Sequence, residues 1–265
     1  MNRIGNIVSD FAGLLRVCGP VVALRWLIAL LPRISQVLKG RNLQPVDRSL
    51  GRGPFTVTLP TAVSPFLVMG EGVISGIREM YARDCYLRGG KLVIRDGDVV
   101  IDLGANIGNF TNLALSHGPS VRVIAVEPSR ALNAAFEASV SQNKGFRDRV
   151  FLVRALLGQA GEKQKAIIIS DDNYRGAPWI SESDLIQQAG IDRIDLLKCD
   201  IEGGEFGLLS RNSRLLAMAR NLAIEIHAFA GDVENFVETL VQAGFSIRFR
   251  QNAPDGSCVV LASRA

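Results

Sequence analysis

Short apolar runs alternate, from residue 99 onward, with segments whose apolar residues recur at helical spacing. The runs have the length of strands buried on both faces and cover residues 99–101, 121–126, 150–156, 165–170, 194–200 and 221–227. Helices are predicted between them over residues 109–115, 129–143, 205–210 and 232–245. Strands that alternate with helices predict a mostly parallel sheet with right-handed crossovers.

Two hairpins are predicted outside the alternating region. At the end of the chain, apolar runs over residues 245–250 and 257–263 flank a Pro-Asp-Gly turn. This hairpin adds one antiparallel strand to the sheet. Before the alternating region, residues 55–59 and 64–70 predict a second antiparallel hairpin, and residues 72–87 predict a helix.

The first fifty residues follow a different pattern. Apolar positions share one helical face over residues 1–18, Gly19 and Pro20 break that helix, and an apolar cluster around Trp26 follows. Spanning a bilayer takes ~20 largely apolar residues, and charges interrupt both stretches, so we expect neither a membrane span nor a cleaved signal peptide. Two interpretations stay open: the helices lie in a membrane interface, or they pack on the body or on a second subunit. Residues 40–54 predict a linker.

Charge is distributed unevenly along the chain. Residues 1–53 hold eight Lys or Arg against Asp10 and Asp47, a net charge of +6, which leaves −2 for the remainder of the total of +4. The basic character therefore belongs to the N-terminal segment, and we expect no nucleic-acid-binding face on the rest.

Length and composition fit one large domain, or a domain with an extension. The 265 residues are 48% hydrophobic, which is enough for a substantial core. No two of the four cysteines have metal-ligand or redox spacing; they are Cys18, Cys85, Cys199 and Cys258. We therefore expect reduced thiols in a cytoplasmic protein.

A glycine-bearing loop joins the first central strand to its helix. Asp102, Gly104 and Gly108 stand in the order Asp-x-Gly-x-x-x-Gly. Glycines allow positive φ angles and close approach of a ligand, and the free N–H groups of the following helix face what is bound. The Gly-x-Gly-x-x-Gly order of dinucleotide sites is absent, so a ligand without a pyrophosphate fits better.

An acid follows at the end of the next strand. Glu127 comes nineteen residues after Gly108, where a carboxylate can accept hydrogen bonds from both ribose hydroxyls of a nucleoside. The loop and the acid together predict an S-adenosylmethionine site.

Further chemistry-bearing residues fall at the ends of the predicted strands, where open parallel sheets bind ligands. Lys198 shares a face with Asp200, and Glu225 shares one with His227. A lysine in an apolar strand needs a carboxylate partner, and Asp200, Glu202 and Glu225 are candidates. The cluster either receives the methyl acceptor, or Asp200 caps the next helix while Lys198 neutralises the charges.

His227 is the candidate general base, because methyl transfer to an alcohol needs a group that accepts the hydroxyl proton. His117 is expected to be a solvated residue at a helix end. An alternative has Asp200, Glu202 and His227 holding a divalent ion, but their spacing does not require one, and we predict no metal.

Two further features of the sequence have either a functional or a structural interpretation. Tyr81 and Tyr86 either line a pocket or fill the core. The polar loop over residues 171–179 either covers an acceptor site or forms a surface connection.

Three blocks of the sequence resemble the FkbM family of S-adenosylmethionine-dependent methyltransferases. They are VVIDLGANIGNFT, VIAVEPS, and IDRIDLLKCDIEGGEFGLL followed by LAIEIH. The centre of the third block, Lys198 to Glu205, is the most specific, and the likeness runs from Phe55 to the C-terminus. Family members typically have Ala where Gly204 stands, which is a change between small residues.

The resemblance implies an α/β fold of the class I methyltransferase type. That fold is a Rossmann-like, mostly parallel seven-stranded sheet with an antiparallel C-terminal hairpin, here with an N-terminal helical extension. We assign residues 1–50 to the extension and residues 51–265 to the methyltransferase domain. The cofactor would be bound by Asp102, Gly104, Ala105, Asn106 and Gly108 around its methionine part, by Glu127 at its ribose, and by the adjoining Asn109 and Pro128.

The resulting hypothesis is a cytoplasmic, S-adenosylmethionine-dependent O-methyltransferase. Its acceptor would be a hydroxyl of a saccharide, a glycan or a secondary metabolite, with peripheral membrane contact through residues 1–40 left open. The predicted catalytic residues are His227, Asp200, Lys198 and Glu202. The alternatives are a nicotinamide-dependent oxidoreductase, a nucleic-acid methylase, and a non-catalytic membrane-peripheral protein on the same fold.

Overall fold

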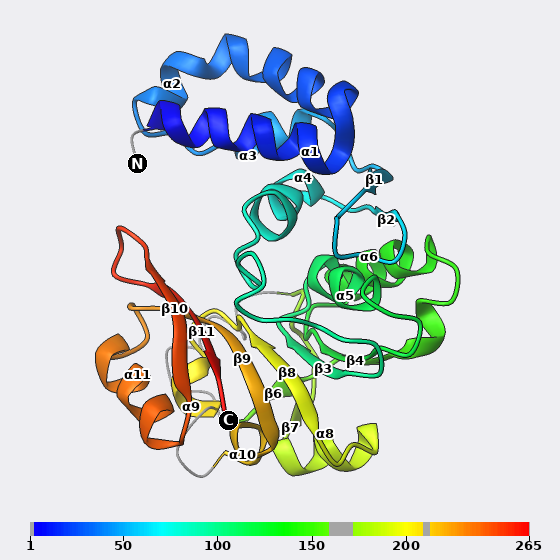
Figure 1. The fold of residues 1–265 in the computed structure, drawn as a ribbon, viewed down its shortest axis with the longest axis vertical. Helices are drawn as coiled ribbons and strands as arrows, with labels where there is room; N and C mark the ends of the chain where they lie inside the picture. Colours follow the sequence, from blue (N-terminus) through cyan, green and yellow to red (C-terminus); the bar gives the residue numbers. More distant parts are fainter. Residues whose placement is uncertain (1–2, 159–171, 209–212, 265) are drawn as a thin grey trace.

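A seven-stranded sheet forms the centre of the computed structural model, which describes residues 3–158, 172–208 and 213–264 (Figure 1). In the described residues its order is β10-β11-β9-β8-β3-β4-β5, and all its neighbouring strands are parallel except those that pair with β11. The strands are β3 (Val99–Leu103), β4 (Arg122–Val126), β5 (Val150–Val153), β8 (Ile194–Cys199), β9 (Ala219–Ile226), β10 (Ser246–Asn252) and β11 (Cys258–Ser263). This confirms the predicted fold class.

Helices cover both faces of the sheet, which explains why its strands are apolar throughout. One face packs on α5 (Asn109–Leu115) and α6 (Arg130–Ser141), and Val100 and Ala125 point to it. The neighbouring positions, such as Ile101, point to the opposite face. That face is covered by α8 (Glu182–Ala189), α10 (Arg214–Met218) and α11 (Val233–Gln242).

The N-terminal segment folds into a helical hairpin at one end of the molecule (Figure 1). Helix α1 (Arg3–Leu30) is kinked at Gly19, where φ is 80° and ψ is 177°, and Pro20 follows. The chain continues through η1 (Leu31–Arg33), α2 (Ile34–Leu38) and α3 (Gln44–Ser49). The linker prediction for residues 40–54 was therefore wrong over α3, which forms because Val46 and Leu50 are buried.

Buried charges attach this hairpin to the rest of the chain. The guanidinium of Arg78 lies 2.8 Å from Asp10 and 2.6 Å from Asp47, and Trp26 donates a hydrogen bond to Asp47. Arg83 also pairs with Asp10, at 2.7 Å. The inner face of the hairpin thus packs on the body, and one hydrophobic core runs from it to α5. The division at residue 50 stays a prediction.

By length and composition alone, one helical stretch, Ile4–Leu38, could cross a membrane, and 28% of its most apolar window is buried. The kink at Gly19 divides α1 into arms over residues 3–18 and 20–30. Each arm is shorter than the ~20 residues that a span requires.

The shorter elements follow the predictions in part. Strands β1 (Phe55–Val57) and β2 (Phe66–Val68) form the expected antiparallel hairpin. The helix predicted over residues 72–87 is α4 (Val73–Gly76) followed by the π-helical turn η2 (Ile77–Ala82).

The strand predicted over residues 150–156 divides into β5 and β6 (Leu156–Leu157). The division follows from pairing, because Val126, the last residue of β4, is the partner of Val153. Strand β6 instead pairs in parallel with β7 (Trp179–Ile180). The strand predicted over residues 165–170 lies outside the described residues. The remaining elements of the described residues are η3 (Arg147–Arg149) and α9 (Glu205–Leu208). The last two residues of the helix predicted over 205–210 lie outside the described residues.

Candidate functional site

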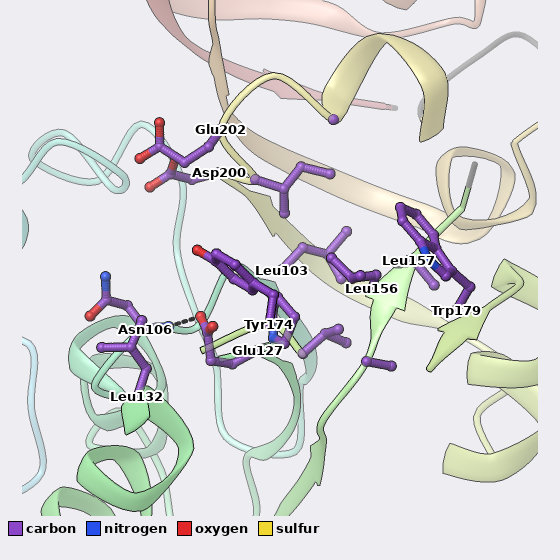
Figure 2. A pocket seen from close by; sticks show the side chains of 16 residues that line it. Leu103, Asn106, Glu127, Leu132, Leu156, Leu157, Tyr174, Trp179, Asp200 and Glu202 are labelled. Carbon is purple, nitrogen blue, oxygen red and sulfur yellow. Dashed lines mark hydrogen bonds between the residues drawn. The ribbon is translucent and has the colours of Figure 1, made fainter. Parts of the chain in front are cut away.

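A cavity of about 240 Å³ lies at the carboxyl ends of β3, β4 and β8 (Figure 2). The strand order reverses between β3 and β8, which is where open α/β sheets bind ligands. The lining consists of Leu103, Gly104, Asn106, Val126, Glu127, Pro128, Leu132, Ala155, Leu156, Leu157, Tyr174, Trp179, Asp200, Ile201, Glu202 and Gly204.

The glycine loop forms one wall of this cavity. Gly104 has a φ of +73°, and a Cβ there would lie 1.8 Å from the carbonyl oxygen of Asp200. The close approach that requires this glycine is therefore to the chain's own backbone. Gly108, at φ +83°, begins α5 in the left-handed conformation. Both glycines have the positive φ angles predicted from the sequence.

Glu127 is held against this loop and is only 4% exposed. Its carboxylate accepts hydrogen bonds from the backbone N–H of Asn106, at 2.9 Å, and of Ser129, at 2.8 Å. A carboxylate has about four acceptor sites, so about two remain for a ligand in the cavity. Burial raises the pKa of Glu127, and the two backbone hydrogen bonds oppose that shift.

Apolar side chains line the cavity away from the loop (Figure 2). Tyr174 and Trp179 come from the loop that the sequence left open as a cover or a connection, and Leu132 comes from α6. Flat aromatic and aliphatic surfaces suit the ring of a purine. Except for that loop, this side of the site was not predicted from the sequence, because single apolar residues on separate elements form no pattern.

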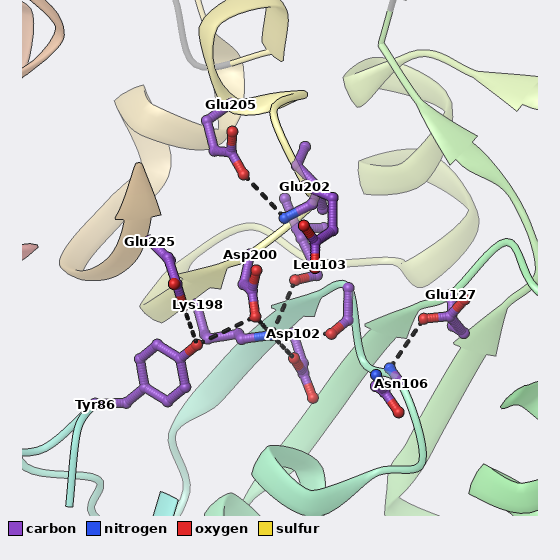
Figure 3. Close-up of polar contacts among 12 residues, drawn as sticks. Tyr86, Asp102, Leu103, Asn106, Glu127, Lys198, Asp200, Glu202, Glu205 and Glu225 are labelled. Atoms are coloured by element: carbon purple, nitrogen blue, oxygen red, sulfur yellow. Dashed lines mark hydrogen bonds and ion pairs between the residues drawn. The ribbon is translucent and has the colours of Figure 1, made fainter. Parts of the chain in front are cut away.

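The register of the sheet determines the partner of Lys198. Strands β3 and β8 pair Asp102 with Lys198, whose Nζ lies 3.3 Å from the Asp102 carboxylate and 3.8 Å from that of Asp200 (Figure 3). The ammonium also donates to the carbonyl oxygens of Leu103 and Gly104. Burial lowers the pKa of Lys198, but the carboxylates outweigh this effect and raise it. A carboxylate partner is present as expected, but the nearest one, Asp102, was not among the three candidates; of those, Asp200 lies within ion-pair distance.

Tyr86 connects two carboxylates beside the cavity. Its hydroxyl lies 3.2 Å from Asp200 and 3.4 Å from Glu225 (Figure 3). We call Asp200, Glu225 and Tyr86 the carboxylate cluster. Burial first, and then the negative charges of Asp200 and Glu79, raise the pKa of Glu225 to about 7. Tyr86 is buried against Phe110 rather than exposed to the cavity, and Tyr81 is also buried.

His227 lies just beyond β9, between two glutamates. Its Nδ1 is 3.1 Å from Glu205, and its Nε2 is 3.6 Å from Glu202. Burial lowers the pKa of His227, but the hydrogen bond to Glu205 and the nearby carboxylates together raise it to about 9. The ring therefore carries a proton at neutral pH, which does not suit the general-base role expected from the sequence.

Glu205 fixes the turn between β8 and α9. The same oxygen that contacts His227 accepts hydrogen bonds from the backbone N–H of Ile201 and of Gly203. The side chain is fully buried. Glu205 was not predicted as a site residue, although it stands in the most specific of the three blocks.

The three candidate metal ligands do come together. The donor atoms of Asp200, Glu202 and His227 lie within 4.8 Å of one another. The Nδ1 atom of His227 is bonded to Glu205, so Nε2, on the side of Glu202, is the ring atom that could act as a ligand. The absence of a metal stays a prediction.

The family model described as methyltransferase FkbM domain matches residues 102–247, more than half of the chain. The chain belongs to the FkbM methyltransferase family. The 31-O-demethyl-FK506 methyltransferase FkbM of Streptomyces tacrolimicus is 29% identical, over 66% of this chain and 82% of that protein. The AMB antimetabolite synthetase AmbE of Pseudomonas aeruginosa is 26% identical over 66% of this chain, which spans 11% of AmbE.

Among solved structures, the chain is similar to Aeropyrum pernix fibrillarin in complex with natively bound S-adenosyl-L-methionine. The two are 15% identical, with a TM-score of 0.43, over 78% of this chain and 93% of that one. As an FkbM methyltransferase the chain is an S-adenosylmethionine-dependent enzyme.

The residues of the cavity fit this cofactor. Glu127 has acceptor capacity left, the loop turns its backbone to the cavity, and the apolar side accepts a purine. The predicted cofactor residues that line it are Gly104, Asn106, Glu127 and Pro128. The other four are buried and do not line it: Asp102, Ala105, Gly108 and Asn109. Of the predicted catalytic residues, Asp200 and Glu202 line the cavity, and Lys198 and His227 lie behind or beside it.

Proposed function

We propose that this FkbM methyltransferase methylates a hydroxyl group of a saccharide, a glycan or another secondary metabolite. The observation that carries the proposal is the carboxylate cluster beside the cofactor cavity, which gives a hydroxyl proton somewhere to go. S-adenosylmethionine supplies the methyl group, bound to a sulfonium centre.

Proton acceptance is the task that an alcohol acceptor imposes on the protein. Glu225 has its pKa near 7, so a large share of it is ionised at neutral pH, and Asp200 lies beside it across Tyr86. We assign proton acceptance to this pair. His227, already protonated, holds the turn around Glu202 and supplies positive charge at the rim of the cavity.

Lys198 acts from beneath the site in this proposal. Its ammonium pairs with the carboxylates of Asp102 and Asp200, and its bonds to two backbone carbonyls fix the start of the glycine loop. A buried lysine with these partners is a positioning residue rather than a base, because its raised pKa keeps it protonated.

The comparisons support an oxygen acceptor without naming it. One relative, aligned over 82% of its own length, is named as a methyltransferase of an O-demethyl compound. The net charge of −2 outside residues 1–53 gives no support for a nucleic-acid substrate. We also propose that the enzyme works in the cytoplasm, in keeping with its four free cysteines.

Methyl transfer from labelled S-adenosylmethionine tests the proposal. The purified chain is offered a panel of hydroxylated sugars and polyketide alcohols beside a matched panel of amines, and products that gain one methyl group are located by fragmentation mass spectrometry. We expect label on oxygen. Label confined to nitrogen or carbon, with the cofactor still bound, would reject the hydroxyl acceptor.

A further inference from the structure

The outer face of the N-terminal hairpin is apolar and exposed. The exposed aliphatic residues recur three, four or seven positions apart, both before Gly19 and from Val21 to Leu38, so each set forms one stripe on the side opposite the buried Val17 and Trp26. Between 38% and 68% of each residue is exposed: Ile4, Val8, Leu15, Val21, Leu24, Ile28, Leu31, Ile34 and Leu38. We call these nine residues the aliphatic face. A contiguous exposed apolar patch of this kind marks an interaction site.

The charge around the aliphatic face has one sign. The only acids among the first 53 residues, Asp10 and Asp47, are buried and paired with Arg78 and Arg83 of the body. The exposed charges of the hairpin segment are therefore basic; they include Arg16, Arg25, Lys39, Arg41 and Arg48. The first two donate only to backbone carbonyls in the bonds described, so their charge is not neutralised there.

A basic hollow adjoins the aliphatic face. It has a volume of about 350 Å³ and lies where α2 ends. Arg33, Arg41 and Asn42 line it together with Gln36, Val37 and Pro45. Ile34 and Leu38 of the aliphatic face stand on the same short helix, so an anionic group in the hollow would lie beside exposed aliphatic side chains.

We infer that residues 3–41 dock this enzyme on the surface of an anionic lipid bilayer. The aliphatic face enters the boundary between headgroups and acyl chains, and the arginines and Lys39 contact lipid phosphates. Apolar side chains flanked by basic ones are the composition of helices that lie in a membrane interface.

Two other ways of covering the aliphatic face, a second copy of the chain and a bilayer span, fit the observations less well. A second copy would bring the same basic surface against itself, and like charges oppose such pairing. A bilayer span would have to pull Asp10 and Trp26 away from their buried partners and place Arg16 and Arg25 in hydrocarbon. A hairpin that lies in the plane of the bilayer surface keeps its inner face packed on the body, as it is in the structure.

Vesicle flotation of the full chain tests the inference. Phosphatidylcholine vesicles with and without phosphatidylglycerol are compared, each in low salt and in ~1 M salt, where charges are screened within ~3 Å. We expect flotation with the anionic vesicles in low salt and release in high salt. No flotation with phosphatidylglycerol would overturn the inference.

Paired variants separate the contribution of the aliphatic face from a general loss of solubility. L24D/I28D should lower vesicle binding at least ~10-fold, whereas V241D, an equally exposed apolar position on α11, should bind like the wild type. The charge pair K39E/R41E should weaken binding to anionic vesicles, and its control K91E/K144E should not. Binding that survives L24D/I28D would contradict the inference.

Further measurements check that the variants are folded and test for a dimer and for a bilayer span. Calorimetric binding of S-adenosylhomocysteine should be unchanged in all four variants, which shows that each is folded. Light scattering should find the wild type monomeric without lipid; a dimer that L24D/I28D dissociates, without vesicle binding, would assign the face to a second copy. Retention on membranes after alkaline carbonate extraction would indicate a span.

Discussion

Glu225 and His227 stand two residues apart on the same strand end, and their surroundings act on them in opposite ways. Burial and neighbouring acids favour the neutral form of Glu225, whereas the bond to Glu205 favours the charged form of His227. The pKa values, about 7 and about 9, leave the glutamate as the group that can exchange a proton at neutral pH. The chemistry of the site therefore depends on which side chain has which neighbours.

Replacing Glu225 tests its assignment as proton acceptor. Glu225→Gln should lower kcat by ~10² or more and remove the rise of kcat with pH that ionisation near pH 7 produces in the wild type. Binding of S-adenosylhomocysteine should not change. Glu238→Gln, at an exposed position on α11, is the control. A variant that keeps the wild-type rate and pH profile would remove Glu225 from this role.

Glu127 is expected to act in cofactor binding alone. Glu127→Ala should weaken S-adenosylmethionine binding by about 1 to 3 kcal/mol, because charge-assisted hydrogen bonds to the cofactor and to Asn106 are lost. Isothermal titration measures this change, with Glu137→Ala on the exposed side of α6 as control. Wild-type affinity in Glu127→Ala would reject the ribose assignment.

The bond between His227 and Glu205 should make stability depend on pH. The folded-state pKa of His227, about 9, is above its ordinary value of 6.5, so the stabilisation is complete below pH 6.5 and is lost as pH rises through 9. Denaturant unfolding across this window should show the loss in the wild type and a smaller one in His227→Gln. Equal pH dependence in both proteins would show that the pair does not stabilise the fold.

The site residues that could be predicted from the sequence are those that lie at the ends of the predicted strands. Asp102 lies near the end of β3, and Glu127, Asp200 and His227 follow β4, β8 and β9. The carboxyl ends of parallel strands meet at one edge. The partner of Lys198 was not predictable, because Asp102 becomes its neighbour through the register of β3 and β8, which the sequence does not encode locally. The protonation of the His227 ring was not predictable for the same reason, because Glu205 comes into contact with His227 only in the folded chain.

At the scale of elements, the glycine loop is coupled to the neighbouring turn. Its first glycine packs on the carbonyl of Asp200, so the cofactor loop and the strand end that carries the carboxylate cluster fix each other's position. Sequence patterns predicted β3, the glycine loop and α5. They missed α3, whose six residues are too few for a periodic signal, and the end of β5, which depends on the length of its neighbour β4.

Alanine at Gly104 tests this coupling. Gly104→Ala should cost about 3 kcal/mol of folding free energy or more, because a positive φ and a clash with backbone combine. Gly145→Ala, at a similar φ with nothing within 4 Å of the added methyl group, should cost only about 1 kcal/mol. Chemical denaturation compares the two variants, and equal costs would show that the contact with Asp200 is unimportant.

For the whole molecule, the N-terminal hairpin is both an outer surface and part of the core. Leu14, Val17 and Trp26 belong to the same hydrophobic cluster as α5, and the buried Arg78 depends on two acids of the hairpin segment. The sequence showed its amphipathic character but could not show that one apolar face would be buried and another exposed. That division arises from the kink at Gly19 and the partners on η2.

Removing residues 1–50 should therefore destabilise the chain rather than release an independent domain. The deletion uncovers Ile74 and Ile77 and takes the acids away from Arg78, so we expect a lower Tm and a tendency to aggregate. Thermal unfolding with and without S-adenosylhomocysteine measures the effect. A truncated chain with the wild-type Tm would support a true boundary at residue 50.

A crystal structure with S-adenosylhomocysteine bound tests the central claim most directly, because it locates the cofactor among the residues of the cavity. We expect the ribose hydroxyls within hydrogen-bond distance of the Glu127 carboxylate, the purine beside Tyr174 and Trp179, and the sulfur near Asp200. A cofactor bound elsewhere, or one whose ribose does not contact Glu127, would contradict it.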